Sequence, residues 1–115
     1  MQVIFHVDEL EKWPLAAGNV ENMLAYCEES GETAQIEVLA NGVAVRALAP
    51  GQGDGALLQR IAALAEKGVV FAACRNALRA QRLEPKALAQ FAVTVPAGVV
   101  ELAQKQQAGY AYIRP

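Results

Sequence analysis

The residues best suited to chemistry in this sequence are Cys74 and the two polar residues that follow it, Arg75 and Asn76. Residues 69–73 are apolar and begin with strand formers, a pattern typical of a strand buried on both faces. Helix formers follow over residues 75–81, so Cys74 is expected where a buried strand ends and a helix begins. Free N–H groups at the start of that helix and the charge of Arg75 both favour a nucleophilic thiolate.

Cys74 also fits a purely structural role, because cysteine is among the most buried residue types and often acts as a small hydrophobe. Spacing alone does not separate this interpretation from the functional one. Cys27 shares an apolar helical stripe with Val20 and Met23, which predicts a buried, unreactive side chain. The cysteines form no CxxC motif, and a single histidine leaves too few ligands for a zinc site. We therefore expect neither a metal nor a cofactor.

Polar residues also follow two other predicted strands. Asp8 comes after a strand over residues 2–7, and Asn41-Gly42 turns the chain after a strand over residues 35–40. The carboxyl ends of parallel strands meet at one edge of a sheet, where ligands bind in such folds. The supporting residues predicted at that edge, around Cys74 as the nucleophile, are Asp8, Asn41, Gly42, Arg75 and Asn76.

Two further features have structural interpretations. His6 interrupts the first apolar strand, and a lone histidine in a strand is more often a packed core or interface residue than a catalyst. The GQGDG segment at residues 51–55 resembles a phosphate loop only superficially, because it joins two helical segments and no Lys-Ser/Thr follows it. Asp54 within it is a good N-cap for a helix over residues 55–67.

Strands alternate with helices along the whole chain, which predicts one α/β domain over residues 1–115, a parallel sheet with helices on both faces. The expected strands cover residues 2–7, 35–40, 69–74, 91–95 and 110–113. The expected helices cover residues 14–29, 43–49, 55–67, 75–81 and 96–108. The pattern itself does not distinguish the strand order 4-3-2-1-5 from the order 2-1-3-4-5.

Composition narrows the classes of partner. The chain is 54% hydrophobic, which favours self-association, and its net charge of -2 comes with no basic run. Nucleic acid and anionic membrane surfaces are therefore not expected partners. The first residues lack the basic n-region of a signal peptide, and no apolar run approaches the ~20 residues of a membrane span. We expect a cytoplasmic protein with reduced thiols.

Four segments, taken in order, resemble the short, mostly uncharacterised members of the DsrE-like family. They are FHVDELEKWPLAAGNVENML, VLANGVAV, FAACRNALRA and VPAGVVELAQKQQAGYAYIRP. The resemblance implies a three-layer α/β/α fold with strand order 4-3-2-1-5 and a homotrimer or homohexamer. It also implies a carrier cysteine after the third strand, at the position of Cys74, that holds sulfur as a persulfide. No second cysteine lies near Cys74 to resolve a persulfide into a disulfide.

Two functions from different classes follow from these observations. The first is a sulfur-relay protein that receives sulfane sulfur on Cys74 from a donor protein and passes it to an acceptor. The alternative is a non-catalytic oligomer of the same fold that binds a small molecule or acts as an accessory protein. A metal or redox sensor built on Cys74 and His6 is disfavoured, because the ligands are too few.

Overall fold

The computed structural model describes residues 1–115 as a five-stranded parallel sheet in the order β4-β3-β2-β1-β5. The strands are β1 (Gln2–Val7), β2 (Gln35–Ala40), β3 (Val70–Cys74), β4 (Val93–Val95) and β5 (Ala111–Ile113). This arrangement confirms the predicted α/β class and the strand order that the resemblance implied, and it rules out the order 2-1-3-4-5 for this chain.

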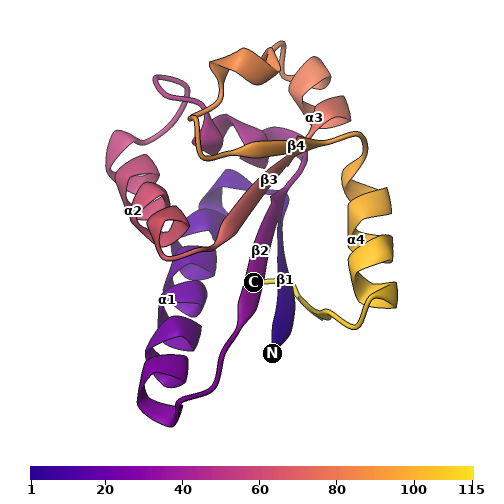
Figure 1. Ribbon diagram of the computed structural model, residues 1–115. Coiled ribbons are helices and arrows are strands. Elements are labelled where there is room, and N and C mark those ends of the chain that lie inside the picture. Colours follow the sequence, from indigo (N-terminus) through magenta and orange to yellow (C-terminus); the bar gives the residue numbers. More distant parts are fainter.

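Helices lie on both faces of the sheet, as predicted, but they are distributed unequally. The α-helices are α1 (Trp13–Ser30), α2 (Gly55–Glu66), α3 (Arg75–Ala80) and α4 (Gly98–Gln107), and three 3-10 helices are η1 (Leu10–Lys12), η2 (Gly42–Leu48) and η3 (Pro85–Ala87). Figure 1 shows α1 and α2 together on one side of the sheet and α4 alone on the other. One face of the sheet is therefore covered by a single helix.

Local signals explain where the main helices begin and end. The Asp54 carboxylate accepts hydrogen bonds from the Ala56 and Leu57 N–H groups, which confirms it as the N-cap of α2. Pro14 occupies the first turn of α1, where its missing N–H has no helical partner. Gly31 ends α1 with φ +78°, a left-handed conformation that a residue with a side chain rarely adopts.

The two faces of the sheet bury cores of different size. The larger core, under α1, α2 and η2, includes the fully buried Trp13, whose indole N–H donates to the Ala44 carbonyl at 3.0 Å. The smaller core, under α4, consists of four buried residues: Ile4, Leu39, Ala72 and Leu102. Because apolar burial drives docking, α4, which buries only Gly98 and Leu102, is held less firmly than α1, which buries four residues.

The structure corrects two predictions about strands and one about the last helix. The β3 run is not buried on both faces, because Val70 faces the α4 side beyond the reach of that helix and is 43% exposed. The fourth strand covers only Val93–Val95, since Phe91 instead packs edge-on against Phe71 in the larger core. The last helix begins at Gly98, two residues after the predicted start at Pro96.

The prediction that Cys27 is buried is also wrong. Cys27 is only partly buried and does not belong to the core. Ala16 and Val20 of the same stripe are buried, whereas Met23 is partly buried. Figure 1 shows the last turns of α1 running past the start of β2, so this end of the apolar stripe has no sheet beneath it.

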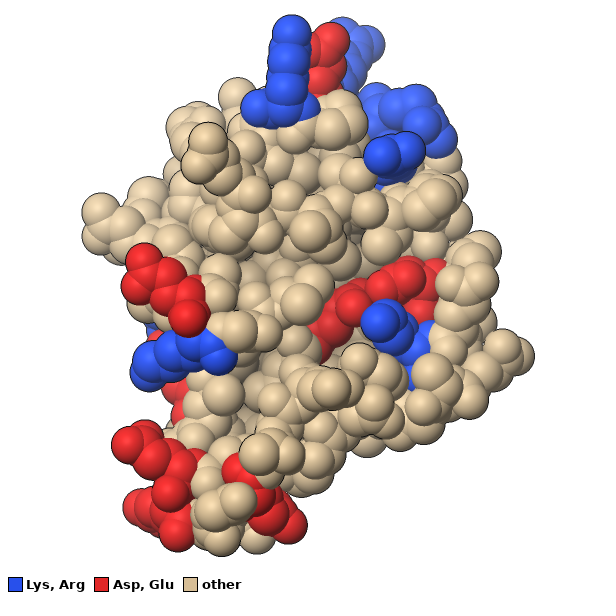
Figure 2. Space-filling model, viewed as in Figure 1, with Lys and Arg blue, Asp and Glu red and all other residues tan.

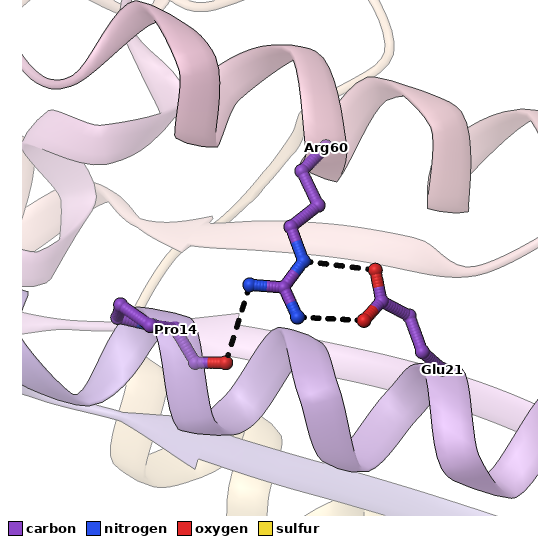
Figure 3. Close-up of polar contacts among 3 residues, drawn as sticks. All are labelled: Pro14, Glu21 and Arg60. Atoms are coloured by element: carbon purple, nitrogen blue, oxygen red, sulfur yellow. Dashed lines mark hydrogen bonds and ion pairs between the residues drawn. The ribbon is translucent and has the colours of Figure 1, made fainter.

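A salt bridge joins α1 to α2 on the outer surface of the larger layer. The Arg60 guanidinium donates from Nε to Glu21 Oε2 at 2.8 Å and from Nη2 to Glu21 Oε1 at 2.6 Å (Figure 3). It also donates to the Pro14 carbonyl at 3.5 Å. The hydrogen bond from Arg60 is the main cause that lowers the pKa of Glu21, and burial opposes it weakly.

Candidate functional site

Cys74 lies where the sequence predicts it, at the carboxyl end of β3 and at the N-cap of α3. Its backbone is still extended, so the side chain turns toward the first N–H groups of α3. The Ala77 N–H donates to Sγ at 3.4 Å. The residue is buried, with 6% of its surface exposed. The sulfur is therefore held by an amide donor but has little contact with solvent.

The structure brings Asn41 close to Cys74. Ala40 of β2 is the register partner of Ala73, so Asn41 lies beside Cys74 on the neighbouring strand. Gly98, the first residue of α4, packs over both of them. A Cβ at that position would lie 3.3 Å from the Cys74 Cβ and 3.4 Å from the Asn41 Nδ2. The lack of a side chain at Gly98 thus allows α4 to begin directly over the cysteine.

Arg75 and Asn76 are both exposed and have different hydrogen-bond partners. Arg75 donates from Nε to the Thr94 hydroxyl at 3.0 Å, which directs its guanidinium toward β4 beside Cys74. The side-chain carbonyl of Asn76 accepts a hydrogen bond from Arg79 within α3. Arg75 is thus held at the flank of the site by a neighbouring strand, whereas the Asn76 carbonyl is engaged within its own helix.

Asp8 and Gly42 form a neighbouring corner of the same edge, over β1 and β2. The Asp8 carboxylate accepts a hydrogen bond from Arg114 at 2.8 Å, which ties the C-terminal residues to β1. Gly42 has φ +55°, and a Cβ there would lie 3.3 Å from the Asp8 carbonyl oxygen. Glycine is therefore required by conformation and by close backbone contact, independently of any ligand.

His6 was predicted to be a packed, hydrogen-bonded residue, and its hydrogen bonds connect it directly to the site. Its ring contacts the Tyr112 hydroxyl through Nδ1 at 2.7 Å and the Asn41 Oδ1 through Nε2 at 3.1 Å. An amide oxygen only accepts, so in a neutral ring Nε2 donates to Asn41 and Nδ1 accepts from Tyr112. This chain fixes the Asn41 amide with its NH₂ group toward Gly98 and Cys74. The contribution of Tyr112 had no signal in the sequence, since it depends on the pairing of β5 with β1.

A second polar cluster, which the sequence analysis missed, lies at the opposite edge of the sheet. Glu37 of β2 is 5% exposed, and its Oε2 atom has no hydrogen-bond donor within reach. Its other oxygen, Oε1, lies 3.6 Å from Lys105 Nζ of α4. The available signal was a glutamate inside an otherwise apolar strand and the Glu101, Lys105 pair one helical turn apart.

Burial of Glu37 is the main cause that raises its pKa, to about 7, and the hydrogen bond and negative charge of Glu101 add to this against the pull of Lys105. A carboxyl group donates a hydrogen bond only while it holds a proton, so Glu37 is mostly a neutral donor below pH 7 and is about half ionised near pH 7. Burial lowers the pKa of Lys105, but the charges of Glu37, Tyr110 and Glu101 outweigh it and raise that pKa overall.

Glu37 borders the larger of the two cavities, with a volume of about 370 Å³. Its lining residues are Ala34, Gln35, Ile36, Glu37, Lys67, Gly68, Val70, Lys105 and Tyr110. Figure 2 shows acidic and basic side chains together in a hollow on this face, beside α4. The second cavity, of about 260 Å³, is bordered by η1, α1 and α2. Neither cavity includes Cys74.

Charge is distributed unevenly between the ends of the molecule. Figure 2 shows basic side chains at the end near α3 and acidic ones at the end of α1. The basic residues in and after α3 are Arg75, Arg79, Arg82 and Lys86. No three His, Cys, Asp or Glu side chains come together as metal ligands, and none of the helices has the length and apolar character of a membrane span.

Comparison with known proteins identifies the relatives of this chain. A protein of unknown function from Methanobacterium thermoautotrophicum, MTH1491, has a similar structure, with a TM-score of 0.88 and 33% sequence identity over 99% of this chain and 98% of that one. The ychN protein of E. coli superimposes with a TM-score of 0.72 and 19% identity over 100% of both chains, which shows a common fold. None of the curated proteins matches. The DsrE/DsrF-like family model matches residues 11–115, and the chain therefore belongs to the DsrE/DsrF-like family.

Proposed function

We propose that this protein carries sulfane sulfur as a persulfide on Cys74 and passes it to an acceptor protein. The observation that carries the proposal is the position of the Cys74 sulfur, which accepts an N–H hydrogen bond at the start of a helix on the carboxyl edge of the sheet. Such an environment stabilises negative charge on sulfur. Membership of the DsrE/DsrF-like family is consistent with a sulfur-relay role.

The transfer needs no external oxidant or reductant. The Cys74 thiolate attacks the terminal sulfur of a donor persulfide, a new S–S bond forms, and the donor cysteine leaves as a thiolate. An acceptor thiolate then attacks the sulfur held on Cys74, and Cys74 leaves as a thiolate in turn. Each step exchanges one S–S bond for another, so the oxidation state of the transferred sulfur does not change.

Three groups around Cys74 suit the anionic species in these steps. The Ala77 N–H already donates to the sulfur, and the Asn41 NH₂ group, oriented by His6, lies on the side of Gly98. Arg75 supplies positive charge at the flank, where it donates to the Thr94 hydroxyl. We assign Cys74 as the nucleophile and Asn41 and Arg75 as groups that stabilise the persulfide anion.

The alternative function, a non-catalytic binding or accessory protein, is favoured by one specific observation. Cys74 is 6% exposed, and the largest cavity lies at the opposite edge of the sheet, beside Glu37. In this alternative the cysteine is a packed residue and the cavity binds a small molecule. Reactivity of Cys74 in the folded protein separates the two functions, because only the carrier requires it.

We also propose that the protein forms a homo-oligomer, a homotrimer before a homohexamer. The face that carries α4 leaves large apolar side chains exposed, on the sheet and at the start of α4. They are Val70, Val93, Val99, Val100 and Tyr112. Uncovered apolar side chains on one face are typical of a subunit interface. Light scattering at micromolar concentration tests the proposal, and a monomer would contradict it.

Mass spectrometry of the unreduced protein tests the sulfur-carrier function. After incubation with a persulfide donor, the peptide that contains Cys74 is expected to gain the mass of one sulfur atom, and dithiothreitol should remove it. Cys27→Ala should retain the increment and Cys74→Ser should lose it. Labelling that follows Cys27 instead, or no increment on either cysteine, would leave the binding function as the better explanation.

A further inference from the structure

The start of α4 packs on Cys74 from one side, while the larger core holds the cysteine from the other. Gly98 at the first turn of α4 packs against the Cys74 Cβ, and no side chain caps the N-terminus of this helix. Its buried residues are Gly98 and Leu102 alone, whereas α1 buries four residues. A single buried leucine holds a helix weakly, because docking strength depends on the apolar area removed from water. Small changes in other contacts can therefore shift the position of α4.

The polar contact between α4 and the sheet is formed by Glu37 and Lys105, and the charge of Glu101 on the same helix also acts on Glu37. Glu37 is buried under the helix, one of its oxygens lacks a donor, and the other meets Lys105 at 3.6 Å. Lys67 lines the same cavity from the turn before β3, and Tyr110 lies under the Lys105 ammonium at 4.9 Å. The strand neighbours of Glu37, Ile4 and Val70, add no charge.

We propose that α4 is a pH-responsive cover over Cys74, held closed while the Glu37 carboxyl buried beneath it is neutral and loosened when that carboxyl ionises. The inference rests on the proposed function, because it describes how the buried sulfur becomes accessible to a donor or an acceptor. Loss of the proton leaves Glu37 as a buried carboxylate whose Oε2 has no donor, with Lys105 Nζ 3.6 Å from Oε1 and the negative charge of Glu101 opposing it. Separation of α4 from β2 relieves the repulsion and hydrates both groups.

The size of the effect follows from linkage between proton binding and opening. Glu37 ionises near pH 7 under the helix and near its ordinary value of 4.5 once it is hydrated. The ratio of open to closed molecules should then increase about tenfold between pH 6 and pH 8, because the open state binds fewer protons over that range. Cys74 should become accessible in the same proportion, since Gly98 moves with the helix.

The test measures alkylation of Cys74 by iodoacetamide in a Cys27→Ala background, with and without Glu37→Gln. We compare the two proteins by dividing the alkylation rate of the parent by that of Glu37→Gln. The effect of thiol ionisation on the rate is the same in both proteins and cancels in this ratio. That ratio is expected to rise about tenfold from pH 6 to pH 8. A ratio that stays constant would overturn the proposal. Glu101→Gln provides a second variant, which should reduce the rise without abolishing it, because burial, the main cause of the raised pKa of Glu37, remains.

Hydrogen exchange of the α4 amides in a Cys74→Ser variant gives a readout that does not depend on sulfur chemistry. After correction for the intrinsic effect of pH, the protection of those amides should fall about tenfold from pH 6 to pH 8 when residue 37 is glutamate. It should remain constant in the Glu37→Gln variant. Light scattering at pH 6 and pH 8 completes the test. If alkylation rises only as subunits dissociate, Glu37 and Glu101 act at a subunit interface, and the proposal that α4 covers Cys74 is wrong. If the exchange pattern is as expected but no persulfide forms on Cys74, the sulfur-carrier function is refuted, whereas the proposal that α4 responds to pH is still supported.

Discussion

Replacement of Glu37 by glutamine should change the pH dependence of stability more than any other single substitution in this protein. Glutamine has nearly the same shape and cannot ionise, so the packing under α4 is retained while the titration is removed. In the folded protein Glu37 keeps its proton up to about pH 7, because of burial and then of Glu101. In the unfolded chain it loses the proton near its ordinary value of 4.5.

The sign and the size of the effect follow from these two values. Between them the folded state binds more protons than the unfolded state, so the contribution of Glu37 to stability is largest in acid and is lost as pH rises through 7. Integration from pH 5 to pH 8 gives a loss of about 2.5 kcal/mol in the free energy of unfolding. Glu37→Gln should therefore gain about 2.5 kcal/mol relative to the parent over this range.

Urea unfolding at several pH values from 5 to 8 measures this difference, as the free energy for the variant minus that for the parent. Glu21→Gln is a matched control, because the hydrogen bond from Arg60 lowers the pKa of Glu21. Its stabilising contribution is lost only as pH falls below the ordinary value, so its difference from the parent should stay constant above pH 5. A constant difference for Glu37→Gln as well would refute the assignment of Glu37 as a buried carboxylic acid.

Three further predictions concern the rest of the fold. Gly98→Ala should lower the free energy of unfolding by about 1 kcal/mol in urea titrations, because the new Cβ would lie 3.3 Å from the Cys74 Cβ; an unchanged value would show that α4 shifts freely. Arg60→Lys loses the paired hydrogen bonds to Glu21 and should reduce stability by less than about 1 kcal/mol, since both groups are more than a third exposed. A bulky thiol reagent should label the partly buried Cys27 before the buried Cys74 in native protein, as followed by peptide mass spectrometry, and the reverse order would contradict the observed burial.

The order of elements could be predicted from the sequence because strong local signals mark it. Apolar runs, the Asp54 cap and the glycines that end helices determine where strands and helices lie, and the structure follows them to within a few residues. Strand order required the family resemblance, since the same alternation of strands and helices fits two sheets. The exposure of Val70 and Cys27 could not be predicted, because periodicity shows which face of an element is apolar and not how far its neighbour extends.

The candidate site could be predicted in part, for a similar reason. The position of Cys74 follows from local sequence, and Asn41 joins it because the carboxyl ends of parallel strands meet. His6 joins the site through a hydrogen bond to Asn41 that spans 35 residues, and Tyr112 through one to His6 that spans 106 residues; no local pattern encodes either. Glu37 lies in an apolar strand, and its role depends on which helix covers that strand and on the residues that helix presents.

The two ends of α4 connect the cysteine to the buried carboxyl pair. Its first residue packs on Cys74 at one edge of the sheet, and Lys105 near its last turn meets Glu37 toward the other. A carrier must hold its sulfur away from water, yet it must also present that sulfur to two different proteins in turn. A helix that buries a single leucine and covers a carboxylic acid close to its ionisation midpoint at neutral pH can satisfy both needs, because closed and open arrangements then differ little in free energy. The low exposure of Cys74 is therefore compatible with a carrier, provided that the closed arrangement is the resting one.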